Sequence, residues 1–230
     1  MDFSLNQIAS IVMNDVFAGL KAKTNVPLTI EQVKDEAVAL RGRLMKERFD
    51  SGIKNFEGFY QEINCLSLVC TDISKCCNID SGVKYLGAVV PKLFDLLVPS
   101  KQAVRYVGRA DRFQNFNILT GNDYIDLPYQ RWTSRVPSAW FDYSGMVWIF
   151  NPPTDEMDIL SIIAIFDDPR SVAAYSCACA SDDDPFPIPS WMVDTITGKL
   201  IHDYLRYFRQ GDAQPNTMSP LENGPQPRIV

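Results

Sequence analysis

Apolar residues recur at helical spacing at both ends of the chain, and this pattern constrains the fold more than any other feature. In the first such segment the apolar positions are Ile8, Ile11, Val12, Phe17 and Leu20. Residues three and four apart share one face of a helix, so this spacing predicts a helix over roughly residues 5–21. Ser4 stands where an N-cap is expected.

A second helix is predicted from Thr29, because Gln32 follows three residues later as in a capping box. Its apolar stripe consists of Val33, Ala37, Leu40 and Leu44. The helix should end near residues 51–52, where a serine and a glycine occur. Two amphipathic helices with a short link predict a helical hairpin that forms part of a bundle. Such a stripe faces either a core or another subunit.

The last helical pattern lies near the end of the chain. Met192, Ile196, Leu200, Tyr204 and Phe208 recur every four residues, and Ser190 is a candidate N-cap. Gly198 weakens this helix by about 1 kcal/mol relative to alanine without breaking it.

The middle of the chain changes to short runs rich in β-branched and aromatic residues. These runs cover residues 63–73, 103–110, 116–127, 139–153 and 158–169, with glycine, asparagine and proline between them. The run at 88–97 is ambiguous because Pro91 interrupts it. The pattern predicts an antiparallel sheet or sandwich built from hairpins.

We therefore predict an α+β protein, organised as one composite domain. A helical hairpin at residues 1–58 packs with the β-rich region at 59–187, and the helix at 188–209 returns to the bundle. Residues 210–230 contain several prolines and few apolar residues, which is typical of an extended tail.

Charge and hydropathy exclude several classes of protein. The net charge is −6, and the densest basic run, from Arg41 to Arg48, is accompanied by the acidic residues Glu36 and Glu47. It is interpreted as a solvated helix face, so no phosphate-gripping surface is expected. No run of 18 apolar residues predicts a membrane span. Asp2 stands where a signal peptide needs positive charge, which favours synthesis in a reducing cytoplasm.

Histidine and cysteine give little sign of chemistry. His202 is the only histidine, and it lies inside the last predicted helix. The six cysteines are Cys65, Cys70, Cys76, Cys77, Cys177 and Cys179. Neither the adjacent pair nor the pair one residue apart has the spacing of a structural zinc site. Glycine-rich phosphate loops and nucleophile elbows are also absent from the sequence.

Carboxylates are the remaining candidates. Asp167 and Asp168 end an apolar run just before a proline, which is typical of strand termination. Asp182, Asp183 and Asp184 precede a proline-rich bend and lack the spacing of a calcium loop. We interpret all five as boundaries between elements and predict no catalytic, cofactor-binding or metal-binding residue.

The order of these features resembles the connector or adaptor ring proteins of short-tailed phages, most closely the ring proteins of crAss-like podoviruses. The resemblance rests on the leading helix pair and on a strand that carries Tyr106, Val107 and Gly108. It also rests on residues 146–172, where a hairpin and an apolar strand precede the sequence F-D-D-P-R, and on the proline-rich turn into the last helix.

The resemblance implies a virion protein without enzymatic activity. It implies a cyclic homo-oligomer of twelve subunits at the head–tail connector, assembled in the host cytoplasm. Its partners would be the portal or adjoining tail rings, and viral DNA would pass through the bore without being held. No membrane partner or cofactor is implied. Head-to-tail interfaces of such rings would include aromatics such as Trp132, Trp140 and Trp148, for which a core position is an equal alternative.

Two other functions stay open from the residues alone. The tryptophans and aspartates of the β region also fit a carbohydrate-binding module or a glycan-active enzyme. The helical hairpin at residues 1–52 could instead serve an accessory factor that binds another protein.

Overall fold

The structure, a computed structural model, describes residues 3–20, 27–53, 55–70, 85–94, 103–119, 136–142, 145–152, 159–175 and 181–211. The predicted tail beyond residue 211 lies outside these ranges, as do Trp132, Cys76, Cys77, Cys177 and Cys179. For Cys70 only the backbone is described.

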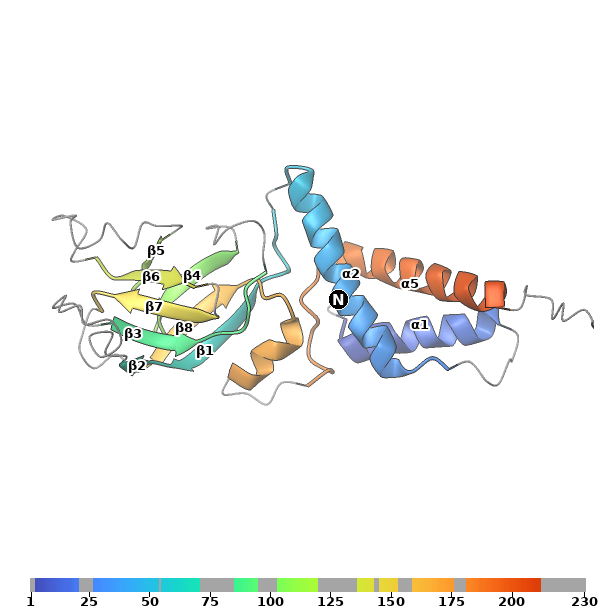
Figure 1. The fold of residues 1–230 in the computed structure, drawn as a ribbon, viewed down its shortest axis with the longest axis horizontal. Helices are drawn as coiled ribbons and strands as arrows, with labels where there is room; N and C mark the ends of the chain where they lie inside the picture. The colour runs from blue at the N-terminus through green and yellow to red at the C-terminus, as the bar shows by residue number, and fades with distance from the viewer. Residues whose placement is uncertain are drawn as a thin grey trace, which may run out of the picture.

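The molecule is elongated, with helices at one end and β-sheets at the other (Figure 1). The helices are α1 (Leu5–Gly19), α2 (Ile30–Asp50) and α5 (Ser190–Gly211). The chain passes from α2 into the sheets, and it returns through the 3-10 helix η2 (Pro169–Tyr175) to α5. This arrangement agrees with the predicted α+β class.

Local signals set the starts of α1 and α2. The Ser4 hydroxyl accepts from the Gln7 amide at 3.1 Å, and the Gln7 side chain accepts from the Ser4 amide at 3.0 Å. Thr29 and Gln32 form the same reciprocal pair. Each box satisfies amide groups that the first helical turn leaves without a partner. Both predicted N-caps are therefore confirmed, whereas α5 begins at Ser190 itself and continues to Gly211.

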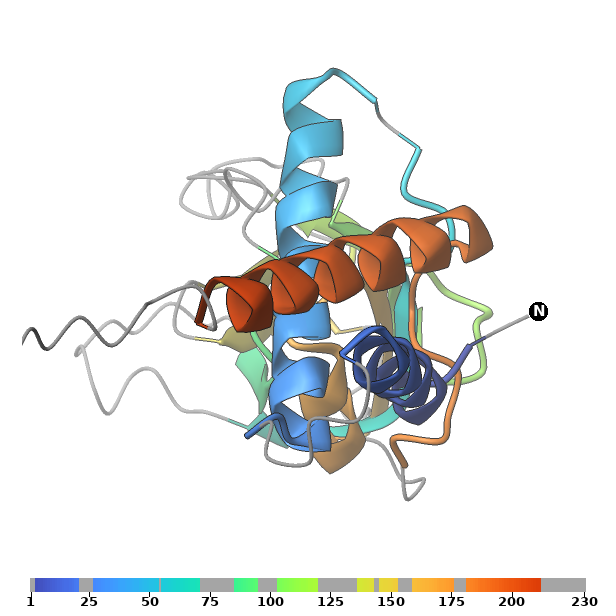
Figure 2. The ribbon, with the colours of Figure 1, turned by 90° about the vertical axis from the view of Figure 1, so that its right-hand side faces the viewer.

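The helical end has its own hydrophobic core. Figure 2 shows α5 crossing α2, with α1 seen end-on beside them, and α5 packs against both other helices. The fully buried side chains include Ile8, Val12 and Ile196. Ile11 and Phe17 of the predicted stripe are exposed. The core therefore joins the first 50 residues of the chain to the last helix.

The β-rich end is a sandwich of two sheets. The smaller has the order β1 (Gln61–Ser67), β8 (Ile159–Ala164), β4 (Val104–Arg109). The larger has the order β2 (Val69–Cys70), β3 (Tyr85–Val89), β7 (Met146–Phe150), β6 (Ser138–Phe141), β5 (Asn117–Leu119). One apolar cluster, which includes Ile63, Val147 and Ile162, fills the space between the sheets.

The pairing of the strands differs in two ways from the predicted row of antiparallel hairpins. Strands β5 and β6 are parallel, and residues 120–137 between them are long enough for the crossover that parallel strands need. Strand β8 pairs with β1 and β4, both distant in sequence. The turn between β6 and β7 is a predicted hairpin that is confirmed, with Gly145 at φ +82°.

Gly198 offers a prediction about α5. A Cβ atom there would meet nothing within 4 Å, and the residue is exposed. Replacing Gly198 by alanine is expected to raise the free energy of unfolding by roughly 0.5–1 kcal/mol, because alanine loses less backbone entropy in a helix. Urea unfolding followed by circular dichroism measures this. An unchanged or lower stability would contradict it.

Candidate functional site

Arg41 lies at the junction between the helical end and the sandwich. Its side chain comes from α2 and is 0% exposed. The guanidinium donates to the carbonyl oxygens of Pro187 and Phe166, both at 3.1 Å, and more weakly to that of Phe59 at 3.4 Å. Phe59 belongs to the connection into the sandwich, and the other two belong to the connection back. Arg41 therefore fastens both connections to the helical end.

Burial is the main influence on the charge of Arg41. It lowers the pKa of the guanidinium to about 10, while the negative charges of Asp167 and Asp168 act in the opposite direction. The arginine therefore remains charged at neutral pH. The interpretation of the basic run as a solvated face is wrong at this position, although Arg43 and Lys46 are exposed.

Asp168 and Arg170 form a second contact at the junction. Arg170 holds Asp168 with two parallel bonds, from Nε to Oδ1 at 3.1 Å and from Nη2 to Oδ2 at 2.9 Å. Its Nη1 reaches Asp35 of α2 at 2.7 Å. Asp167 pairs instead with Lys92 at 3.2 Å, where both side chains are well exposed. The F-D-D-P-R sequence thus joins the end of β8, η2 and α2.

The acidic triplet before α5 is also held by specific partners. Asp182 accepts from the ammonium of the buried Lys34 at 2.7 Å, and this bond raises the pKa of Lys34 despite its burial. Asp183 accepts from the side chain of Asn6 at 2.7 Å. Asp184 accepts from the Ser181 amide at 2.7 Å and so closes a turn. The triplet fixes the bend before α5 against α1 and α2.

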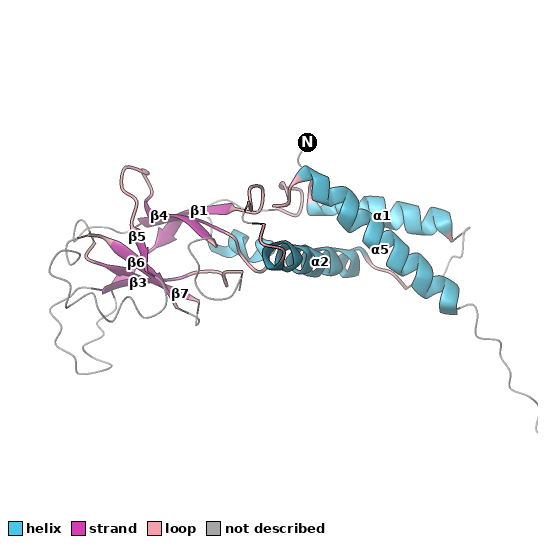
Figure 3. Ribbon diagram, turned by 90° about the horizontal axis from the view of Figure 1, so that it is seen from above, coloured by secondary structure: helices cyan, strands magenta, loops and turns pink. Residues whose placement is uncertain are grey.

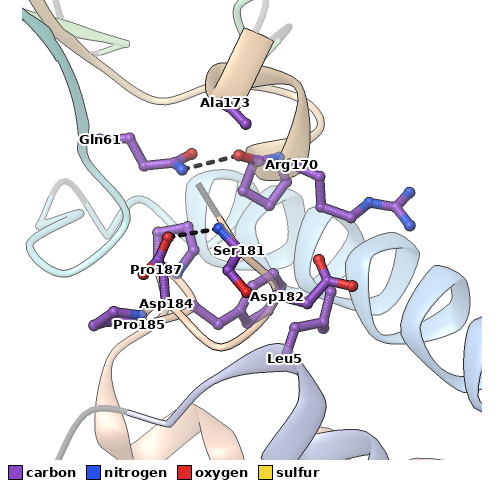
Figure 4. Close-up of a pocket in the computed structure, with 11 residues that line it drawn as sticks. Leu5, Gln61, Arg170, Ala173, Ser181, Asp182, Asp184, Pro185 and Pro187 are labelled. Atoms are coloured by element: carbon purple, nitrogen blue, oxygen red, sulfur yellow. Dashed lines mark hydrogen bonds between the residues drawn. The ribbon is translucent and has the colours of Figure 1, made fainter. Parts of the chain in front are cut away.

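A small pocket lies among these groups (Figure 4). Figure 4 shows Gln61 donating to the carbonyl of Pro169 at 3.0 Å and the Ser181 amide donating to Asp184. The guanidinium of Arg170 points away from the pocket, toward α2. The carboxylates here are engaged with cations and amides. The described residues that line the pocket therefore hold neighbouring elements together.

The other candidate residues lie apart from this pocket. His202 is on α5 with its side chain 73% exposed, and its Nδ1 lies 3.4 Å from Asp203. Cys65 on β1 is a half-buried free thiol. Within the described ranges, no group of three histidine, cysteine or acidic residues is placed to hold a metal ion.

Trp140 and Trp148 lie opposite each other on β6 and β7. Their neighbours Ala139, Val147 and Ile149 face the sandwich core, so alternation places both tryptophans on the outer face of the larger sheet. There they are half-buried and pack against Leu119 and Phe150. Together the four side chains form a small apolar cluster on the outer face of the larger sheet.

The Asp168–Arg170 pair predicts a dependence of stability on pH. Partial burial opposes ionisation of Asp168, but the bonds from Arg170 outweigh it and lower the pKa below 3.8. The pair therefore stabilises the fold above that pH, and its contribution is lost as pH falls through the lowered value. Asp168→Asn keeps an acceptor for the Arg170 amide but loses the charge. We expect it to lower the unfolding free energy at pH 7 by about 0.5–1 kcal/mol, since the pair is partly exposed.

Urea unfolding at pH 7 and at several values below pH 4 measures this effect. The difference between wild type and Asp168→Asn should shrink as the pH falls. Asp167→Asn is the matched control, because it also removes a negative charge that acts on Arg41, whereas its exposed pair with Lys92 is worth little. A difference that grows in acid would show that Asp168 does not act through its charge.

Comparison with known protein families identifies a match over most of the chain. A family model described as phage tail ring protein 2 matches residues 12–219. No curated protein matches the chain. The matched range includes α2, the whole sandwich and α5, so it covers the junction around Arg41 as well as the outer apolar cluster.

Proposed function

The chain belongs to the family of phage tail ring protein 2 and is a structural component of the virion, and from that premise we propose a more specific role. The protein forms one ring of the head–tail connector, between the portal and the tail. The ring is a closed homo-oligomer of twelve subunits, and viral DNA passes through its bore. The family match over residues 12–219 is the observation that carries this proposal.

The architecture supports a structural role. The described carboxylates that could have formed a reactive site pair with lysine, arginine or amide groups. A buried arginine joins the two ends of an elongated subunit, which suits a subunit that must transmit force between neighbours. We propose that it has no enzymatic activity and that it assembles in the host cytoplasm. No described helix is both long and apolar enough to cross a membrane.

The charge of the chain supports the passage of DNA without tight binding. The net charge is −6, and protein–DNA affinity depends largely on cations that neutralise phosphates. Several cations of the described chain are engaged by carboxylates, among them Lys34, Arg105 and Arg170. A bore formed by such subunits would repel rather than hold the phosphate backbone.

Electron microscopy and light scattering of the purified full chain, alone and mixed with the portal protein, test the proposal. Closed rings of uniform subunit number, or rings that form on the portal, are the expected result. A protein that remains monomeric in both samples and never joins a portal or neighbouring ring would contradict it.

A further inference from the structure

Phe113 is the most exposed large hydrophobic residue of the described chain. Its exposed fraction is 92%, and the next values are 71% for Tyr207, 63% for Val69 and 56% for Val89. Single exposed hydrophobic residues are common on soluble proteins and need no explanation by themselves. Phe113 differs because of the loop that carries it.

That loop, residues 109–114 between β4 and β5, is held by several internal bonds. The phenol oxygen of Tyr106 lies 3.0 Å from the carbonyl of Arg109 and 3.2 Å from that of Gln114. The Arg109 amide donates to Gln114, and Asp111 accepts from the Phe113 amide at 3.1 Å. The loop is therefore organised before any partner binds, which lowers the entropy cost of using Phe113 as an anchor.

An apolar groove lies on the sandwich, where β1 passes into β2 beside β3 and η2. Its lining includes Cys65, Leu66, Val69, Val89, Met146 and Tyr175. None of the described residues that line it is charged. Val69 and Val89, two of the four most exposed large hydrophobic residues described, belong to this groove.

The 109–114 loop and β3, which forms one wall of the groove, lie on opposite sides of the sandwich, whereas β1, which forms another wall, contacts the loop through Glu62. In Figure 3 the loop beyond β4 projects from the side away from β3 and β7. Figure 2 shows the same separation, with the 109–114 segment and β3 on opposite sides of the molecule. A cyclic ring needs two different complementary patches on each subunit, because its contacts are head-to-tail, and the loop and the groove are two different patches.

Charge also suits a contact between loop and groove. Arg109 pairs with Asp111 of the same loop at 3.0 Å, and Arg112 pairs with Glu62 of β1. Both arginines beside Phe113 are therefore compensated within their own subunit. The loop therefore brings no unpaired charge to the uncharged groove. An unpaired charge there would weaken the contact.

We propose that Phe113 of one copy inserts into the groove lined by Val69, Val89 and Met146 of the next copy in the ring. The occupant of the groove is a second copy of this chain, and the contact repeats around the ring. This inference rests on the proposed function, because it assigns the subunit interface of the proposed ring.

Photo-cross-linking tests the contact directly. The full chain carries p-benzoylphenylalanine at position 113, is mixed with isotopically heavy wild-type chain, assembled alone or on the portal, and irradiated. Mass spectrometry should find position 113 of light chains joined to heavy peptides that contain residues 65–69, 87–89, 146 or 174–175. Cross-links that stay within one chain, or that join other parts of the neighbour, would overturn the inference.

A pair of variants gives an independent measure. Phe113→Ser should raise the concentration needed for half-assembly by at least about tenfold, as loss of a buried aromatic anchor does. Val89→Lys should act in the same direction. Tyr207→Ser, which removes another exposed aromatic side chain, is the control and should change assembly little. Circular dichroism should show an unchanged fold for all three variants.

Different results would contradict the proposed interface and the proposed function. Rings that assemble normally with Phe113→Ser would contradict the interface and leave the proposed function standing. Wild-type protein that remains monomeric with and without the portal would contradict the proposed function, and the interface with it.

Discussion

Replacing Arg41 by methionine is expected to lower the free energy of unfolding by about 3 kcal/mol. The substitution removes a donor for three carbonyl oxygens at the junction, those of Phe59, Phe166 and Pro187. Methionine fills similar space but donates nothing, so buried acceptors are left without their present partner. Loss of the buried charge works in the opposite direction, but it cannot restore those bonds.

Urea unfolding at fixed protein concentration measures the loss. Arg43→Met is the matched control, because Arg43 is exposed on the same helix and its loss should change stability by less than about 0.5 kcal/mol. Arg41→Lys should be intermediate, since an ammonium cannot reproduce the fork of the guanidinium. Equal effects at positions 41 and 43 would show that the junction does not depend on Arg41.

Replacing Gly108 by alanine should also be costly, by about 3 kcal/mol. A Cβ atom at this position would lie 2.0 Å from the carbonyl oxygen of Gln114 and 2.6 Å from the phenol oxygen of Tyr106. The backbone oxygen cannot move without displacing the loop, and the Tyr106 bonds that organise the loop would be lost with it. Gly108 lies in the strand segment on which the resemblance to ring proteins partly rests.

Gly198→Ala is the matched control for this substitution, because it adds the same atom in open space and should stabilise the protein. The two alanine variants should therefore change the urea midpoint in opposite directions. Gly108→Ala should also impair ring assembly if the 109–114 loop is an interface. A Gly108→Ala protein as stable as wild type would show that the loop readily moves aside.

The helices could be predicted well from the sequence because their signals are local. The capping boxes at Ser4 and Thr29 depend on residues three positions apart, and the apolar stripes depend on neighbouring turns. The sequence also locates most of the strands, but it misses β3, which begins before the ambiguous run at 88–97, and it does not give the strand partners. Strand β8 pairs with β1 about 100 residues earlier, and no local pattern specifies such a pairing.

The partners of the side chains at the junction likewise cannot be predicted from local sequence patterns. The sequence pattern places Asp168 and Asp182 between elements, as the structure does, but it does not identify their partners Arg170 and Lys34. The residue type of Arg41 predicts a surface charge. Its position gave a better signal, since it follows Ala37 by four residues and precedes Leu44 by three, on the apolar stripe.

The helical core has a consequence for the order of events on the ribosome. Helices α1 and α2 are made first, but α5, which completes their core, follows only after residues 51–189. At the usual rate of translation this delay is on the order of ten seconds. During that interval the nascent chain must keep its first two helices with an uncovered apolar face while the sandwich is still being synthesised. A truncated chain that ends before Ser190 can never complete this core, so only products that extend through α5 can present both ends of the subunit to a growing virion.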